Sequence, residues 1–92
     1  MAQLEAEIQQ ARSQITQALA LIDEEERQLR VLEEASNWLG LHGEAGFALQ
    51  RALREDIAAK QRTLAALRRL LDTETRRLWR LEEHLRLRPQ PR

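Results

Sequence analysis

The sequence predicts an all-α protein: an antiparallel two-helix coiled-coil hairpin that forms one domain over residues 1–92. Ala, Leu, Glu, Gln and Arg supply 65 of the 92 residues, and these residue types lose little side-chain freedom in a helix. Apolar residues alternate at spacings of three and four along two long stretches, which is the pattern of a coiled-coil seam. The only glycines fall together at Gly40, Gly43 and Gly46, so the chain has a single break near its middle.

The first helix is expected over about residues 3–39. Gly40 directly follows an apolar residue and is expected to be the glycine just beyond the helix end. One stripe of this helix is apolar over about five heptads, with only two polar members. The stripe consists of Leu4, Ile8, Ala11, Ile15, Ala18, Ile22, Glu25, Leu29, Leu32, Ser36 and Leu39.

A turn is expected at about residues 40–45 and the second helix at about 46–86. Both prolines lie in the last four residues, so residues 87–92 are expected to form a basic tail outside the helix. The stripe of the second helix has the same spacing as that of the first. It consists of Leu53, Ile57, Lys60, Leu64, Leu67, Leu71, Glu74, Leu78, Leu81 and Leu85.

The register of the hairpin follows from the position of the glycines. If the chain reverses near residue 43, facing seam residues have numbers that add up to about 86. Glu25 then faces Lys60, the only lysine in the chain. We interpret these two residues as a register-setting pair, because a polar pair in a seam costs stability but penalises slipped alignments.

The same register makes predictions for the other seam and flank charges. It places Glu33 near Arg54 and Glu7 near Arg77. Glu74 faces only an alanine, so its side chain is expected to extend to water.

Charge is balanced in total but not along the chain. Residues 1–46 carry nine acidic and three basic side chains, whereas residues 47–92 carry six acidic and twelve basic ones. The two arms are therefore expected to attract each other along the hairpin or between chains.

Several apolar residues fall outside the seam, at Leu19, Leu21, Val31 and Leu70. Leu21 and Leu70 share one flank. Because several such residues near the middle of a rod suggest a second apolar stripe, we expect the hairpin to associate into a four-helix bundle. The partner is expected to be a second copy or another helical protein.

The bend carries a short motif, Trp38-Leu39-Gly40, followed by Glu44, Ala45 and Phe47. With this motif at the turn of a helical hairpin, the chain resembles the WxG family of small proteins exported by type VII secretion systems. The resemblance implies dimers that form four-helix bundles, and a bipartite export signal whose second part is Tyr-x-x-x-Asp/Glu. This chain has no tyrosine; the aromatic–acid pair at that spacing is Trp79 and Glu83, within the second helix.

Both tryptophans also have interpretations that need no secretion system. Trp38 is expected to pack across the open mouth of the hairpin and cap its core, with Phe47 on the other side. Trp79 lies outside the seam and is expected to be either a dimer contact or an anchor for a partner.

Few residues could support chemistry. The chain has no cysteine and two histidines. His42 is expected to be solvated in the turn, and His84 has no second ligand at helical spacing. Ser13 and Ser36 have no histidine in register, and no glycine-rich phosphate loop is present. We therefore predict no catalytic, cofactor-binding or metal-binding residues, no small-molecule substrate and no enzymatic activity.

Nucleic-acid binding is a weaker prediction. The arginines of the second helix surround it instead of lining one face, and the chain has too few aromatic residues for base stacking. The arginines in question are Arg62, Arg68, Arg69, Arg76, Arg77 and Arg80.

The location is expected to be cytoplasmic, with leaderless secretion as the alternative. No apolar run approaches the roughly 20 residues of a membrane span, and the first residues lack the pattern of a cleavable signal.

Taken together, these features predict a non-enzymatic helical interaction protein: an adaptor, small chaperone or assembly subunit acting through coiled-coil surfaces. The alternatives are a WxG-like protein, exported by a type VII system or pairing with one of its substrates, and a basic-helix nucleic-acid binder.

Overall fold

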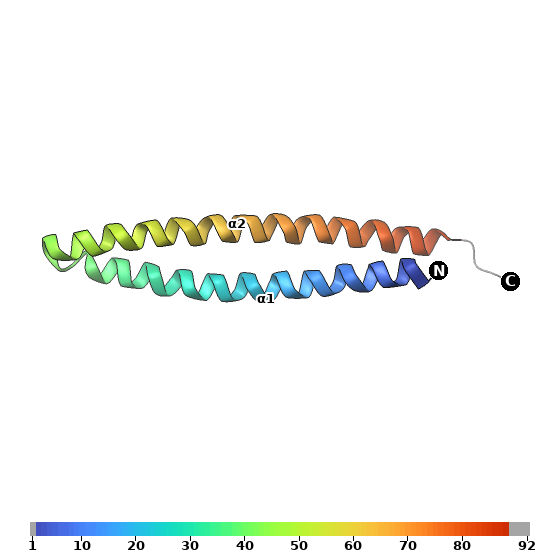
Figure 1. Ribbon diagram of the computed structural model, residues 1–92, viewed down its shortest axis with the longest axis horizontal. Coiled ribbons are helices and arrows are strands. Elements are labelled where there is room, and N and C mark those ends of the chain that lie inside the picture. Colours follow the sequence, from blue (N-terminus) through green and yellow to red (C-terminus); the bar gives the residue numbers. More distant parts are fainter. Residues whose placement is uncertain (1, 89–92) are drawn as a thin grey trace.

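The computed structural model describes residues 2–88 and consists of two long helices joined by a short turn (Figure 1). Helix α1 spans Ala2–Leu39 and helix α2 spans Gly43–Leu87. The helices run antiparallel and form a rod of 76 × 15 × 14 Å. This architecture confirms the predicted all-α helical hairpin. None of the helices in residues 2–88 has the length and apolar character required to cross a membrane.

The helix boundaries differ from the prediction mainly at the start of α2. This helix begins at Gly43, three residues earlier than expected, so the turn comprises only residues 40–42. Helix α1 extends one residue beyond the predicted start. Of the predicted basic tail, Leu87 belongs to α2 and Arg88 is the extended residue that follows it. Residues 89–92 lie outside the described part of the chain.

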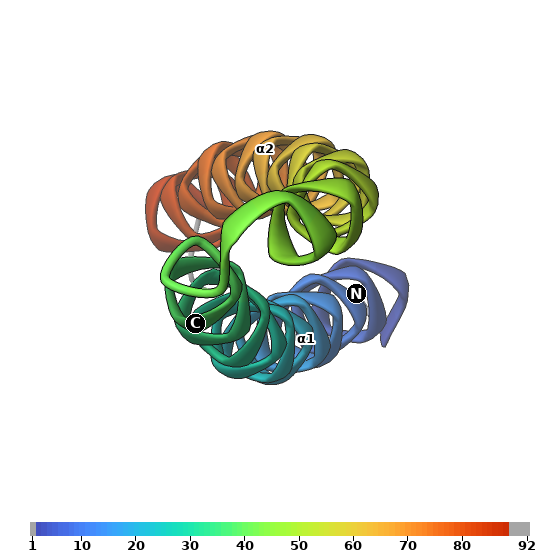
Figure 2. The same cartoon turned by 90° about the vertical axis from the view of Figure 1, so that its left-hand side faces the viewer.

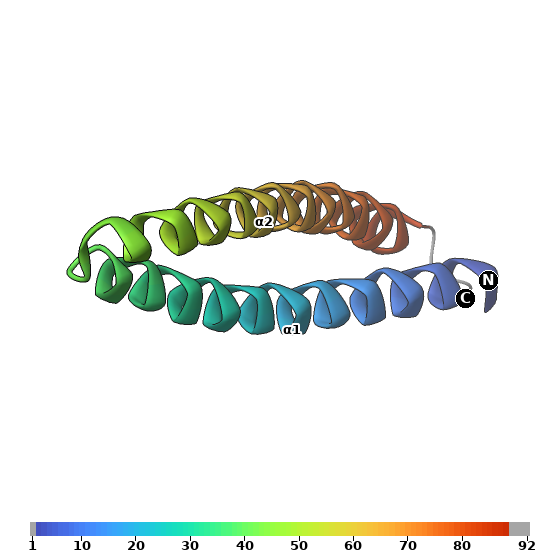
Figure 3. The same cartoon turned by 60° about the vertical axis from the view of Figure 1, so that its left-hand side comes forward.

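The two helices wind around each other over most of their length (Figures 2 and 3). This supercoil is the expected response to an apolar repeat of 3.5 residues, which drifts around a straight helix of 3.6 residues per turn. Every residue of the two predicted seams is buried or half-buried. The apolar side chains most removed from solvent are Ile8, Ala11, Ala18, Ile22 and Leu64.

The turn is closed by backbone hydrogen bonds at the end of α1. The amides of Leu41 and His42 donate to carbonyls three residues earlier, both at 3.1 Å, which tightens the last turn. Gly40 directly follows α1 as predicted, but the glycine with a left-handed backbone is Gly43, at φ +73°. The tight closure at 40–42 moves the left-handed residue to the start of α2.

Gly46 determines how closely α2 starts against α1. It is buried, and a Cβ atom at this position would lie 2.1 Å from the carbonyl oxygen of Leu39. One turn further on, the Gln50 side chain donates to the carbonyl oxygen of Ser36 at 2.9 Å. The absence of a side chain at Gly46 therefore allows the two backbones to meet and fixes the register from the bend outward.

We predict that Gly46→Ala destabilises the hairpin by about 2–3 kcal/mol, because the new methyl group must push α2 away from the Leu39 carbonyl. The measurement is urea unfolding followed by circular dichroism. Gly40→Ala is the matched control: its Cβ would approach mainly the Nε2 atom of Gln50, at 2.9 Å, and this flexible side chain can move away. Equal losses of stability in the two variants would contradict the role assigned to Gly46.

Candidate interaction surfaces

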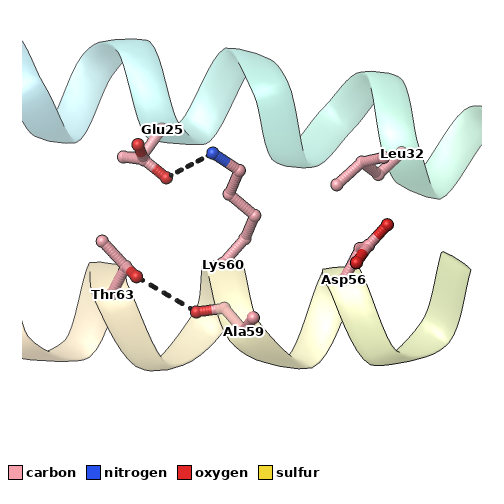
Figure 4. A pocket seen from close by; sticks show the side chains of 6 residues that line it. All are labelled: Glu25, Leu32, Asp56, Ala59, Lys60 and Thr63. Atoms are coloured by element: carbon pink, nitrogen blue, oxygen red, sulfur yellow. Dashed lines mark hydrogen bonds and ion pairs between the residues drawn. The ribbon is translucent and has the colours of Figure 1, made fainter.

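The predicted contact between Glu25 and Lys60 is present in the middle of the rod (Figure 4). The Lys60 ammonium lies 3.0 Å from the Oε2 atom of Glu25, and the two side chains are only 28% and 20% exposed. That oxygen is buried and has no partner in hydrogen-bond geometry, so its contact with Lys60 is an ion pair without a well-aligned hydrogen bond. Lys60 donates a hydrogen bond to the amide oxygen of Gln28.

Glu74, the second acidic residue of the seams, does not extend to water. Its side chain is 12% exposed and lies 3.3 Å from the Arg77 guanidinium on the same helix. With its amide nitrogen turned toward α2, Gln14 also donates to both carboxylate oxygens of Glu74, at 3.0 and 3.2 Å. The expectation of a solvated Glu74 is therefore wrong, because two polar neighbours satisfy the carboxylate beside the seam.

The two flanks of the seam differ in chemistry. In heptad lettering with the seam at positions a and d, the e positions form one flank and the g positions the other. The e flank is bridged between helices by two ion pairs, Arg12–Glu82 at 3.2 Å and Arg68–Glu26 at 3.1 Å. The g flank carries Gln14 and Gln28, which contact Glu74 and Lys60. These two glutamines were not among the residues predicted from the sequence, although their places beside the seam charges could have revealed them.

Attraction between the acidic and basic arms accounts for only part of the observed pairing. Two acids of α1 pair with bases of α2, through Glu25–Lys60 and Glu26–Arg68, whereas Arg12–Glu82 has the opposite polarity. The other ion pairs among residues 2–88 lie within one helix. Arg77 had been expected to lie near Glu7, but it forms its ion pair with Glu74.

The residual charge remains separated across the rod. Helix α1 carries eight acidic and three basic side chains, and α2 carries seven acidic and ten basic ones. No ion pair joins Glu33 and Arg54, the other predicted flank contact, in the described part of the chain. Helix α1 therefore carries a net charge of −5 and α2 a net charge of +3.

Large apolar side chains remain on the surface, including all four that the sequence placed outside the seam. Their exposed fractions range from 46% for Leu70 to 82% for Leu41. A filled seam cannot cover them, because a two-helix rod has only one interior stripe. The exposed set is Leu19, Leu21, Val31, Trp38, Leu41, Phe47, Leu49, Leu70, Trp79 and Leu87.

The aromatic residues at the bend face solvent. Trp38 is 61% exposed and Phe47 51% exposed. The expectation that these two rings cap the core is therefore wrong. The turn between Leu39 and Gly46 is too tight to leave an open mouth for a ring to cover. Trp38 packs instead on the His42 ring, with the ring centroids 4.0 Å apart at an angle of 50°.

The other tryptophan lies near the open end of the rod. Trp79 is 68% exposed and lines two shallow hollows of about 420 and 440 Å³ together with Glu83. The two residues are one helical turn apart, so they share one face of α2. The predicted aromatic–acid pair therefore forms a continuous surface feature.

The carboxylate of Glu83 is held by its neighbour Arg86. A hydrogen bond from Arg86, together with the charge of its guanidinium, lowers the pKa of Glu83 and raises that of Arg86. Because the pKa of Glu83 is lowered, this contact is present above the ordinary pKa of a glutamate. It is lost as the pH falls through the lowered value.

The candidate chemical groups do not converge. Among residues 2–88, no three His, Asp or Glu side chains gather in a way that could hold a metal ion. Both histidines are exposed, one in the turn and one near the end of α2. The hollows in the rod are open grooves along the helices. The groove beside Lys60 has a volume of about 400 Å³ and includes the exposed Asp56 and Thr63 (Figure 4).

Comparison with known proteins identifies no relative of this chain. The chain matches no protein-family model, and neither the curated proteins nor the solved structures give a significant match.

The Glu25–Lys60 pair makes a testable prediction about stability. Lys60→Leu leaves a carboxylate largely buried without its cation and should cost about 1–3 kcal/mol. Adding Glu25→Leu to the same chain should recover that loss or exceed the original stability. Denaturant unfolding of the two single variants and the double variant gives the coupling. If the loss of stability in the double variant equalled the sum of the losses in the two single variants, the pair would not interact significantly.

Proposed function

We propose that this chain is a non-enzymatic helical interaction protein, an adaptor, small chaperone or assembly subunit that acts in the cytoplasm through coiled-coil surfaces. One observation supports the proposal most strongly: within residues 2–88, ten large apolar side chains lie exposed although the seam is filled. Exposed apolar stripes beside a filled seam are suited to bind further helices. The proposed function requires no chemical step from any residue.

The open end of the rod is the best place for a partner outside this chain. Trp79 is a large aromatic side chain that is mostly exposed, and tryptophan is enriched among the residues that dominate binding energy. Glu83 and Arg86 beside it supply charged groups at the rim. A partner helix with a pocket for an indole and a charged edge fits this arrangement.

We predict that Trp79→Ala reduces capture of a helical partner by about tenfold or more, because the mutation removes the anchor. The measurement uses the full chain as immobilised bait in a lysate of the source organism, with quantification of each captured protein. Trp38→Ala is the matched control, since it removes a similarly exposed tryptophan at the other end. Equal capture by the wild type and both variants, or no reproducible partner, would count against the proposal.

A WxG-like protein of a type VII secretion system is the second candidate function. Three features support it: Trp38 and Gly40 lie at the bend of a hairpin, Trp38 is exposed and therefore accessible to a receptor, and Trp79 and Glu83 share one face. In this interpretation the two surface features form the two parts of an export signal.

Nucleic-acid binding has less support than either of these functions. Three of the arginines of α2 that could contact phosphates, Arg68, Arg76 and Arg77, already pair with acids.

For this second candidate, Trp38→Ala should abolish export without unfolding the hairpin, because the exposed ring contributes little to the seam. The test compares the amounts of the protein inside cells and in the medium, in a host with an active type VII system. Phe47→Ala is the control, as it removes an exposed ring at the bend outside the Trp-x-Gly motif. Unchanged medium levels for Trp38→Ala would exclude the export function.

A further inference from the structure

Helix α2 carries a second stripe with the spacing of a coiled-coil seam, on a face that α1 does not cover. Its residues occupy heptad positions c and g and alternate by three and four, as the first seam does. All of them are exposed except the half-buried Arg77. The stripe, called the outer seam below, consists of Leu49, Ala52, Asp56, Ala59, Thr63, Ala66, Leu70, Thr73, Arg77, Arg80, His84 and Leu87.

The outer seam is complementary to itself when two copies of α2 run antiparallel. If facing residues have numbers that add up to 136, every g position meets a c position of the other copy. Each pair then joins a large side chain to an alanine, two side chains of the same type, or two side chains of opposite charge. The resulting pairs are Leu49–Leu87, Ala52–His84, Asp56–Arg80, Ala59–Arg77, Thr63–Thr73 and Ala66–Leu70.

Charge selects this alignment over its alternatives. Asp56 and Arg80 form no ion pair among residues 2–88, and here they meet twice by symmetry. A shift by one heptad places Asp56 opposite Thr73 or Leu87 and separates Leu49 from Leu87. A parallel arrangement instead brings Arg77 and Arg80 against the same residues of the other copy, where like charges repel.

The apolar content of the stripe favours the same occupant. Leu49, Leu70 and Leu87 are 60%, 46% and 71% exposed in the single hairpin, and the antiparallel alignment covers all three. The same heptad positions of α1 also include exposed apolar residues, at Leu21, Val31 and Trp38. Their only charged members are Glu7 and Glu24, so two copies of α1 have no opposite charges there to set an alignment. The surface that is complementary to itself in charge therefore lies on α2.

We propose that the outer seam binds the outer seam of a second copy, antiparallel and centred between Ala66 and Leu70. This inference builds on the proposed interaction function and identifies the partner of one face. Trp79, on the same helix, lies off the outer seam by its heptad position. One of its two hollows shares Arg80, His84 and Leu87 with the outer seam. The other hollow, lined by Glu82, Glu83 and Arg86, contains no outer-seam residue and stays free for a different protein when two copies pair.

The first experiment measures the mass of the chain by sedimentation equilibrium across micromolar concentrations. The wild type is expected at twice the chain mass, and Leu70→Glu at the mass of one chain, because it places a charge at the centre of the interface. Leu19→Glu is the matched control: Leu19 has a similar exposure, 52%, but lies on the e flank, so this variant should stay dimeric. Circular dichroism checks that all three remain helical.

A second experiment tests the alignment. Asp56→Arg and Arg80→Asp should each weaken the dimer by about tenfold or more, since each places like charges opposite each other. The double variant should return to within about threefold of the wild type, because the charges are only exchanged. A double variant weaker than either single variant would exclude this register.

Because the chain has no cysteine, cross-linking provides an independent readout. An oxidised mixture of Leu49→Cys and Leu87→Cys chains should yield a covalent dimer, whereas neither variant alone should do so. Covalent dimers from Leu49→Cys alone would indicate parallel pairing and overturn the proposal.

The outcomes separate this inference from the proposed function. A wild-type chain that sediments as a monomer, or a Leu70→Glu variant that stays dimeric, would overturn pairing through the outer seam but leave partner capture through Trp79 intact. A dimer with the expected register that captures no partner would support the inference and count against the broader interaction function.

Discussion

The structure depends on one narrow contact between two helices. A hairpin of this kind has a single interior stripe, so only five apolar side chains among residues 2–88 are buried, including Ala11 and Ala18. The other seam residues are mostly half-buried and gain only part of the stabilisation that a globular core gives. Stability therefore comes from the length of the seam, and it depends on the close approach of Gly46 to Leu39 that sets the alignment at one end.

Polar residues in and beside the seam give this alignment its specificity. An all-apolar stripe could slide by one heptad at little cost, because leucine packs against leucine in either position. Lys60, held by Glu25 and Gln28 on the opposite helix, has equivalent partners in no neighbouring register. Glu74 and Gln14 add a second such point further along the rod. These contacts exchange some stability for a unique arrangement.

The sequence predicted the features that depend on periodicity. The two helices, the membership of both seams and the Glu25–Lys60 contact follow from spacing and from the position of the glycines. The errors concern features that depend on local geometry. The turn was expected to extend to residue 45, but α2 begins at Gly43. Trp38 and Phe47 were expected to cover a mouth that the tight turn closes. Glu74 was assigned to water because heptad arithmetic does not indicate that Gln14 and Arg77 can reach its carboxylate.

The separation of the two tryptophans along the rod has a mechanical consequence. Trp38 lies at the bend and Trp79 toward the opposite end of a body 76 Å long and about 15 Å wide. Bodies attached at these two places would be kept apart by a stiff spacer and would not compete for the same space. The distance between the two sites is fixed by the number of helical turns between them. Adding or removing whole heptads would therefore change this distance and leave the direction in which each surface points unchanged.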